Sequence, residues 1–202
     1  SILILVFPKL FENVSPNINI TNTNTKKEII NSEIKYNFEI PNQDGLDDFR
    51  NKSFSSTGDI SQFVLTKNSQ VLNFKSLSPF INQRFIDGFS GVISGEYFYG
   101  FYKNENVNQP FIIFKINNRD ESEKVLQTLE RTMYSDLGVA LQIENDTKNE
   151  TRIFENFVSV INPVRELKNT EQKTILVYGF VNDEFVVITG SKETFSFVKQ
   201  RI

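Results

Sequence analysis

Polar and apolar residues alternate along several short stretches of the chain, and this period of two predicts β-strands. The alternation is clearest in residues 29–40, where Ile34, Tyr36, Phe38 and Ile40 are separated by polar residues. Apolar runs bounded by turn-forming residues predict further strands. These are expected over residues 60–66, 71–74, 96–103, 111–116, 157–161, 164–167, 174–181 and 184–189.

The strongest helical pattern lies between residues 120 and 137. Its apolar residues recur at helical spacing and are Val125, Leu126, Leu129, Met133 and Leu137. Asp120, followed three residues later by Glu123, resembles a capping box at the start of this helix. Gly138 stands at the position of a C′ glycine at its end.

Shorter helices are predicted mainly from their start signals. Ser78 and Pro79 have the order typical of a helix start, and the apolar stripe that follows them ends at Gly88. Ser191 is placed to cap a last helix, and residues 44–51 are expected to form a short helix.

Strands joined by hairpins, with helices interspersed, are typical of the α+β class. We therefore expect a mainly antiparallel sheet with helices packed on one face. The expected single domain covers residues 28–202. Residues 8–27, which are rich in Asn and Thr and contain two Pro, are expected to form a flexible spacer, with an extended edge strand as the alternative.

The first seven residues are expected to be the end of an apolar anchor or signal segment. Residues 2–7 are all apolar, but a bilayer span requires about 20 such residues. No basic region of the kind that opens a signal peptide is present. One interpretation is that a segment upstream of Ser1 completes a membrane anchor. The alternative is a short buried strand, or an initiator Met removed before Ser1.

The absence of His, Cys and Trp from all 202 residues excludes several kinds of chemistry. Without His and Cys, the chain lacks the usual ligands of zinc, haem and iron–sulfur clusters, and it lacks Ser-His and Cys-His nucleophiles. No phosphate-binding loop or dinucleotide fingerprint occurs. A net charge of −3 with scattered basic residues disfavours nucleic-acid binding. We therefore expect no cofactor, no metal and no nucleic-acid partner.

The aromatic strand at residues 96–103 is the best candidate for a binding surface. Tyr97, Tyr99 and Phe101 project to one face of this predicted strand. If that face is open, the rings can stack on a sugar or anchor a protein partner. The alternative is a central strand covered on both faces, which carries such an apolar run without any ligand.

The acidic residues form no recognisable catalytic or metal-binding pattern. The loop at residues 144–150 offers oxygen ligands but lacks the spacing and the central Gly of an EF-hand loop. Glu130 and Asp136 lie on different faces of the predicted helix, so they are not expected to act as one acid–base pair. Glu130 and Arg131 are expected to face solvent.

Several segments in the second half of the chain carry a family resemblance. They are residues 109–115, 129–137, 157–162 with Arg165, 176–180 and 187–189. On these segments the chain resembles uncharacterised proteins encoded by ultra-small candidate-phyla bacteria of the Patescibacteria type. The resemblance implies a single-pass membrane protein with a Pro-containing spacer and one extracytoplasmic domain, and it implies no activity.

The sequence thus favours a non-catalytic, extracytoplasmic domain of the cell envelope over an enzyme. We expect a scaffold or protein-interaction module at the cell membrane, with envelope proteins or cell-wall components as partners. The alternative function is a glycan- or peptide-binding domain that uses strand 96–103. A hydrolase built on two carboxylates about 5–10 Å apart is a further alternative. The alternative location is the cytoplasm.

Overall fold

The computed structural model describes residues 29–32, 34–39, 60–104, 107–143, 153–157 and 164–202. The strands in these ranges are β1 (Ile34–Glu39), β2 (Ile60–Lys67), β3 (Gln70–Val71), β4 (Ile93–Asn104), β5 (Val107–Ile116), β6 (Phe154–Phe157), β7 (Val164–Lys168), β8 (Thr174–Phe180) and β9 (Phe185–Thr189). The helices are the short 3₁₀-helix η1 (Phe74–Ser76) and the α-helices α2 (Gln83–Phe89), α3 (Arg119–Leu137) and α4 (Lys192–Lys199).

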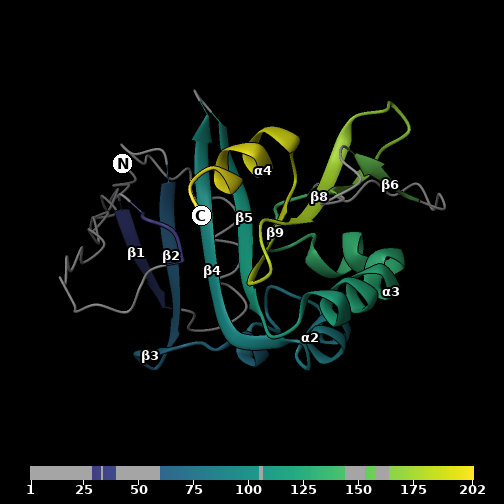
Figure 1. Cartoon of the computed structure of the whole chain (residues 1–202). Coiled ribbons are helices and arrows are strands. Elements are labelled where there is room, and N and C mark those ends of the chain that lie inside the picture. Colours follow the sequence, from purple (N-terminus) through teal and green to yellow (C-terminus); the bar gives the residue numbers. More distant parts are fainter. Residues whose placement is uncertain (1–28, 33, 40–59, 105–106, 144–152, 158–163) are drawn as a thin grey trace, which may run out of the picture.

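The nine strands belong to one sheet (Figure 1). Eight of them follow the order β1-β2-β4-β5-β9-β8-β7-β6, and β3 pairs with β2. Neighbouring strands are antiparallel except for β1 and β2, which are parallel. The predicted α+β class with a mainly antiparallel sheet is therefore confirmed.

Strand β5 lies in the middle of the sheet, between β4 and β9. The first half of the chain forms the sheet on the β4 side, and the second half forms it on the β9 side. β4 and β5 form a long hairpin, and α3 then carries the chain towards the far edge of the sheet. The strands β6, β7, β8 and β9 bring it back. In the closing pair, Phe111 of β5 lies opposite Thr189 of β9, and Lys115 lies opposite Phe185. Pairing of β5 with β9 thus joins the two halves of the chain.

The face of the sheet that carries α2 and α3 is lined by aromatic rings. Phe114 of β5 packs against Phe74 of η1 and against Phe85 and Phe89 of α2, with ring centroids 5.2, 6.4 and 5.4 Å apart. Leu126, Leu129, Met133 and Leu137 of α3 belong to the same buried cluster. The helical spacing in residues 120–137 therefore marks the side of α3 that faces the core.

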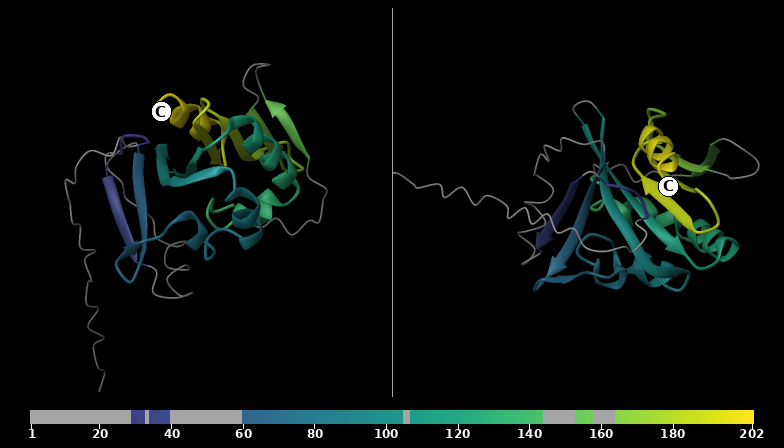
Figure 2. Two further views of the ribbon diagram at one scale, coloured as in Figure 1. Left: turned by 60° about the horizontal axis from the view of Figure 1, so that its bottom comes forward. Right: turned by 60° about the vertical axis from the view of Figure 1, so that its left-hand side comes forward.

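Helix α4 packs on the opposite face, whereas the sequence pattern predicted helices on one face only (Figure 2). Its Phe195 and Val198 join the buried cluster that contains Phe111 and Val187. Gly179 of β8 makes room for the helix, because a Cβ atom there would stand 2.7 Å from Cζ of Phe195. Two covered faces are needed because β5 and β9 are apolar at consecutive positions.

Local capping signals place the starts of two helices differently from the prediction. α2 begins after Asn82, whose side chain accepts a backbone hydrogen bond of 3.0 Å, and not at Ser78. α3 begins after Asn118, whose Oδ1 accepts a hydrogen bond from the amide of Glu121 at 3.0 Å. The capping box predicted at Asp120 is therefore wrong, because an Asn earlier in the chain supplies the cap.

Other boundary signals give a mixed outcome. Ser191 caps α4 as predicted, since its hydroxyl accepts a backbone hydrogen bond of 3.2 Å. Gly138 follows α3 with φ −55°, so it does not take the left-handed conformation of a C′ glycine. Of the strand predicted at residues 71–74, only Val71 is extended, within β3, and Phe74 begins η1.

Several predicted segments lie outside the described residues. They are the anchor end and spacer (residues 1–27), the helix at 44–51 and the acidic loop at 144–150. Of the strand predicted at 157–161, only Phe157 is described, as the last residue of β6. Among the helices of the described ranges, none has both the length and the apolar character that crossing a membrane requires.

Candidate functional site

The candidate aromatic strand lies within β4, and two of its three candidate residues are fully in the core. Tyr99 and Phe101 are 3% and 2% exposed, and both rings pack against Phe63. The Tyr99 hydroxyl donates a 2.7 Å hydrogen bond to the carbonyl oxygen of Ala140, just beyond α3. The chain beyond α3 therefore covers this part of β4.

Tyr97, the third candidate, packs at the edge of the same cluster. Its ring is partly buried, and its hydroxyl donates a 2.9 Å hydrogen bond to the carbonyl oxygen of Leu72. Burial raises the pKa of both Tyr97 and Tyr99, which keeps the two phenols protonated as donors. The interpretation of this strand as one covered on both faces fits these positions, and we assign the three side chains to the core.

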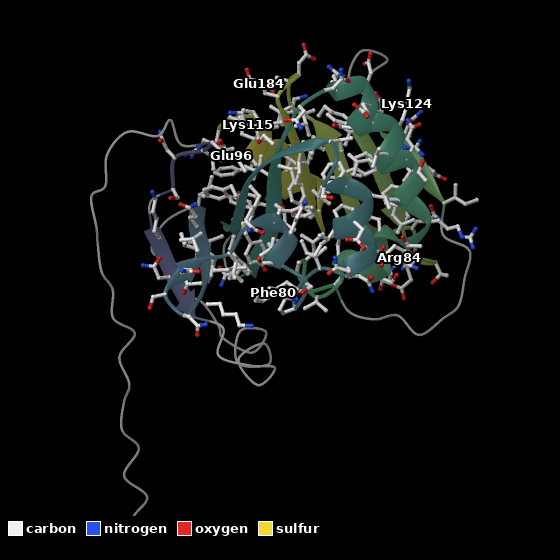
Figure 3. All side chains as sticks on the ribbon, turned by 90° about the horizontal axis from the view of Figure 1, so that it is seen from below. Phe80, Arg84, Glu96, Lys115, Lys124 and Glu184 are labelled. Carbon is white, nitrogen blue, oxygen red and sulfur yellow. The ribbon has the colours of Figure 1, made fainter. Side chains whose placement is uncertain are left out.

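Asp136 of α3 is buried in an ion pair with Arg84 of α2. Its Oδ1 accepts a 2.6 Å hydrogen bond from Nη2 of Arg84, and its Oδ2 accepts one of 3.2 Å from Nε. The Asp136 side chain is 0% exposed, whereas Arg84 reaches the surface seen from below (Figure 3). The hydrogen bonds to Asp136 raise the pKa of Arg84. The pair ties α2 to the last turn of α3.

Glu130 of α3 lies against the sheet, so its predicted solvent-facing position is wrong. Its Oε1 accepts hydrogen bonds from Nε of Arg165 (2.7 Å) and from the Tyr178 hydroxyl (2.6 Å). Its Oε2 accepts a 2.8 Å hydrogen bond from Nη2 of Arg165, and Nη1 of the same side chain donates to Oδ1 of Asn156. The hydrogen bond to Glu130 raises the pKa of Arg165. The pKa of Tyr178 is also raised, mainly by burial and to a smaller extent by its hydrogen bond to Glu130. A bidentate pair of this kind fixes the angle between helix and sheet.

Glu166 of β7 is 3% exposed and lies on the face that carries α4. Its Oε2 accepts a 2.9 Å hydrogen bond from the Thr174 hydroxyl and lies 2.7 Å from Nζ of Lys192, the first residue of α4. Its Oε1 lies 3.2 Å from Nζ of Lys168. Burial by itself raises the pKa of Glu166, but the hydrogen bonds from Lys192, Thr174 and Lys168 together lower it.

These three carboxylates are therefore neutralised by basic side chains from other elements. Glu130 and Asp136 face different neighbours, as predicted, and each has its own Arg. They differ from the surface pair of Lys115 and Glu96, which is 3.9 Å apart and 38% exposed on each side (Figure 3). Such an exposed pair contributes little to stability, about 0–1 kcal/mol.

A cavity of about 590 Å³ lies at the end of the sheet where β9 stops. The residues that line it are Gln109, Tyr134, Leu141, Gln142, Ile143, Asn169, Thr170, Glu171, Lys173, Thr174, Ile175, Gly190 and Ser191. Its volume falls within the range of about 300–1,000 Å³ that is typical of small-ligand sites. Sequence reasoning missed this cavity because its residues come from separate segments and share no motif.

Several polar groups of this cavity already have partners within the fold. Oδ1 of Asn169 accepts hydrogen bonds from the amides of Glu171 and Lys173, which closes the turn between β7 and β8. The Thr174 hydroxyl donates to Glu166, and the Ser191 hydroxyl caps α4. By contrast, no hydrogen bond engages the side chains of the two glutamines of the lining within the part of the chain that the structure describes.

Comparisons of the chain with protein-family models, with curated proteins and with solved structures find no match. Within the described ranges between residues 29 and 202, no group of three or more carboxylates is placed to hold a metal ion. Any assignment of function therefore depends on the chain's own sequence and geometry.

We expect Tyr99→Ala to lower the free energy of unfolding by about 3–5 kcal/mol, because it removes a buried ring and leaves a cavity. Tyr99→Phe keeps the ring and loses only the hydrogen bond to Ala140, which should cost about 1 kcal/mol. Urea unfolding monitored by circular dichroism measures both. A Tyr99→Ala variant as stable as Tyr99→Phe would contradict the assignment of this ring to the core.

We expect Glu166 to make stability depend on pH. Its pKa in the folded chain is below the ordinary value of about 4.5, so the unfolded chain binds more protons and stability rises with pH. The contribution is complete above the ordinary pKa and is lost as pH falls through the lower folded-state pKa.

Melting temperatures of the wild type and of Glu166→Gln, measured from pH 7 to pH 2.5, test this expectation. The gap between the two should be largest near neutrality and should narrow at acidic pH. Glu171→Gln, in the exposed turn between β7 and β8, is the matched control and should follow the wild type. A gap that stays constant with pH would show that the charge of Glu166 does not stabilise the fold.

Proposed function

We propose that this chain is a non-catalytic, extracytoplasmic envelope domain that acts as a scaffold or protein-interaction module. The observation that carries the proposal is the state of the buried carboxylates. Asp136, Glu130 and Glu166 each contact a basic side chain at 2.6–2.7 Å. Their role in the fold is to hold neighbouring elements together.

The electrostatics of these carboxylates do not suit acid–base catalysis. A general acid at neutral pH needs a carboxyl group whose pKa is raised. The pKa of Glu166 is instead lowered, and Glu130 and Asp136 each receive two hydrogen bonds from an Arg. With no His or Cys in the sequence, this leaves little support for a hydrolase.

The envelope location is supported by the beginning of the chain. Residues 2–7 are apolar, and a stretch rich in Asn and Thr follows before the first predicted strand. The resemblance to membrane-anchored proteins of candidate-phyla bacteria points the same way. Envelope proteins or cell-wall components are the partners that this location supplies.

The coding sequence upstream of Ser1 tests the location. We expect it to encode an apolar run of about 20 residues that continues into residues 2–7, because this is the length that spans a bilayer. A reading frame that begins immediately before Ser1 would contradict the membrane anchor and favour the cytoplasmic alternative.

An activity screen combined with a stability measurement tests the non-catalytic role. Glu130→Gln should lower the free energy of unfolding by roughly 1–3 kcal/mol, because Arg165 loses its charged partner in a largely buried site. Glu123→Gln, at a partly exposed position of the same helix where the side chain accepts a hydrogen bond from its neighbour Gln127 on the helix surface, is the matched control and should leave stability nearly unchanged.

In the same screen, the wild type should not hydrolyse nitrophenyl esters, phosphates or glycosides above the rate in buffer. Turnover that Glu130→Gln or Asp136→Asn abolishes in a folded protein would overturn the proposal, because these carboxylates would then have a catalytic role.

A further inference from the structure

The row of strands is interrupted at one end of the sheet. β9 ends at Thr189, which lies opposite Phe111 of β5 on one side and Val177 of β8 on the other. Both neighbours continue past this point, β5 over residues 107–110 and β8 over residues 174–176. Adjacent strands are about 4.8 Å apart, so these two strand ends are separated by roughly two strand spacings. We therefore expect a slot about one strand wide between β5 and β8 beyond Thr189, where Gly190 and Ser191 line it before the chain turns into α4.

The cavity of about 590 Å³ lies at this slot. It is lined by Gln109 of β5, by Thr174 and Ile175 of β8, and by Gly190 and Ser191, which follow β9. The chain turns into α4 directly after Ser191 and leaves the plane of the sheet for the face that carries α4. The space that a longer β9 would fill is thereby left open.

The chemistry of the lining favours a peptide main chain. Gln109 and Gln142 carry carboxamides that can both donate and accept hydrogen bonds, as a peptide group does. Leu141, Ile143 and Ile175 supply apolar contacts for side chains that point from one face of an extended segment. The two charged residues of the lining, Glu171 and Lys173, are of opposite sign, which favours an occupant without a large net charge.

We propose that this slot binds a short extended segment of a partner protein, which lies between β5 and β8 in place of the missing end of β9. The mode is strand addition, in which main-chain hydrogen bonds give affinity and alternate side chains give specificity. The inference rests on the proposed function as an interaction module and names the site and the class of partner.

A glycine in the lining allows the slot to be blocked without disturbing the fold. At Gly190, the nearest atom to an added Cβ is the carbonyl oxygen of Ile175, at 3.7 Å, which is an ordinary contact. Because Gly190 lines the cavity and its Cβ position has only this one close neighbour, we expect a larger side chain there to extend into the cavity. Gly91, in the turn after α2, has no atom within 4 Å of an added Cβ and does not line the cavity. Gly190→Leu and Gly91→Leu therefore make a matched pair of blocked and control variants.

The experiment selects peptides from a phage-displayed library of random heptapeptides on the immobilised 202-residue chain. The affinities of synthetic copies for the chain in solution are then measured. We expect wild type and Gly91→Leu to bind the same peptides equally, and Gly190→Leu to bind them at least tenfold more weakly at an unchanged melting temperature. Gln109→Ala and Gln142→Gly should weaken binding as well. The glycine at 142 suits the backbone there, where φ is +51°.

Three outcomes would overturn the peptide site. In the first, no peptide is retained above background. In the second, the selected peptides bind Gly190→Leu as tightly as the wild type. In the third, the chain binds glycans on an array but no peptide, and Gly190→Leu abolishes the glycan binding. These outcomes leave the non-catalytic role standing if the chain stays inert in the activity screen. Conversely, cleavage of a peptide bound in the slot would support the site and overturn the non-catalytic role.

Discussion

The fold depends on the pairing of β5 with β9. β5 is buried on both faces, with Phe111, Ile112, Ile113 and Phe114 all at 0–1% exposure, and such a strand is stable only when both of its edges are paired and both of its faces are covered. β4 supplies one edge from the adjacent sequence. The other edge comes from residues 185–189, which lie 70 to 78 positions beyond their partners in β5. Pairing these two strands therefore carries the entropic cost of closing a long loop. The sheet is one unit because the second edge of its central strand comes from β9, far along the chain.

Three ion pairs then fix how the helices sit on this sheet. Arg84 with Asp136 joins α2 to α3, Arg165 with Glu130 joins the sheet to α3, and Lys192 with Glu166 joins α4 to β7. In each pair the carboxylate is the more buried partner and the cation is the more exposed one, which limits the cost of removing charge from water. Apolar contacts such as those of Phe114 are not directional, so a helix could slide over them. A hydrogen-bonded ion pair holds its two groups at one relative position, so we infer that these pairs set where each helix lies on the sheet.

The sequence predicted most of the local structure because local structure is encoded by neighbours in the chain. The hairpin of β8 and β9 is found where it was expected, and the Asn182 side chain closes its turn by accepting hydrogen bonds from the amides of Glu184 and Phe185. What the pattern could not supply was the partner of each buried side chain. Glu130 reads as a surface charge until Arg165, 35 positions later, is placed beside it. The hypothesis that Tyr99 lies on an open binding face likewise depended on whether residues near Ala140 cover β4. No local signal in the sequence specifies that contact.

The cavity illustrates the same limit, because three adjacent residues create it through distant contacts. Thr189 ends β9, and its hydroxyl donates a 2.9 Å hydrogen bond to the carbonyl of Pro110. Gly190 adds no side chain, and Ser191 turns the chain into α4 by capping it. A longer β9 would fill the slot but would shift the start of α4, which is held at Lys192 by Glu166. The need to cover the second face of β5 and β9 therefore sets where β9 must stop. The opening between β5 and β8 is a consequence of how α4 is attached.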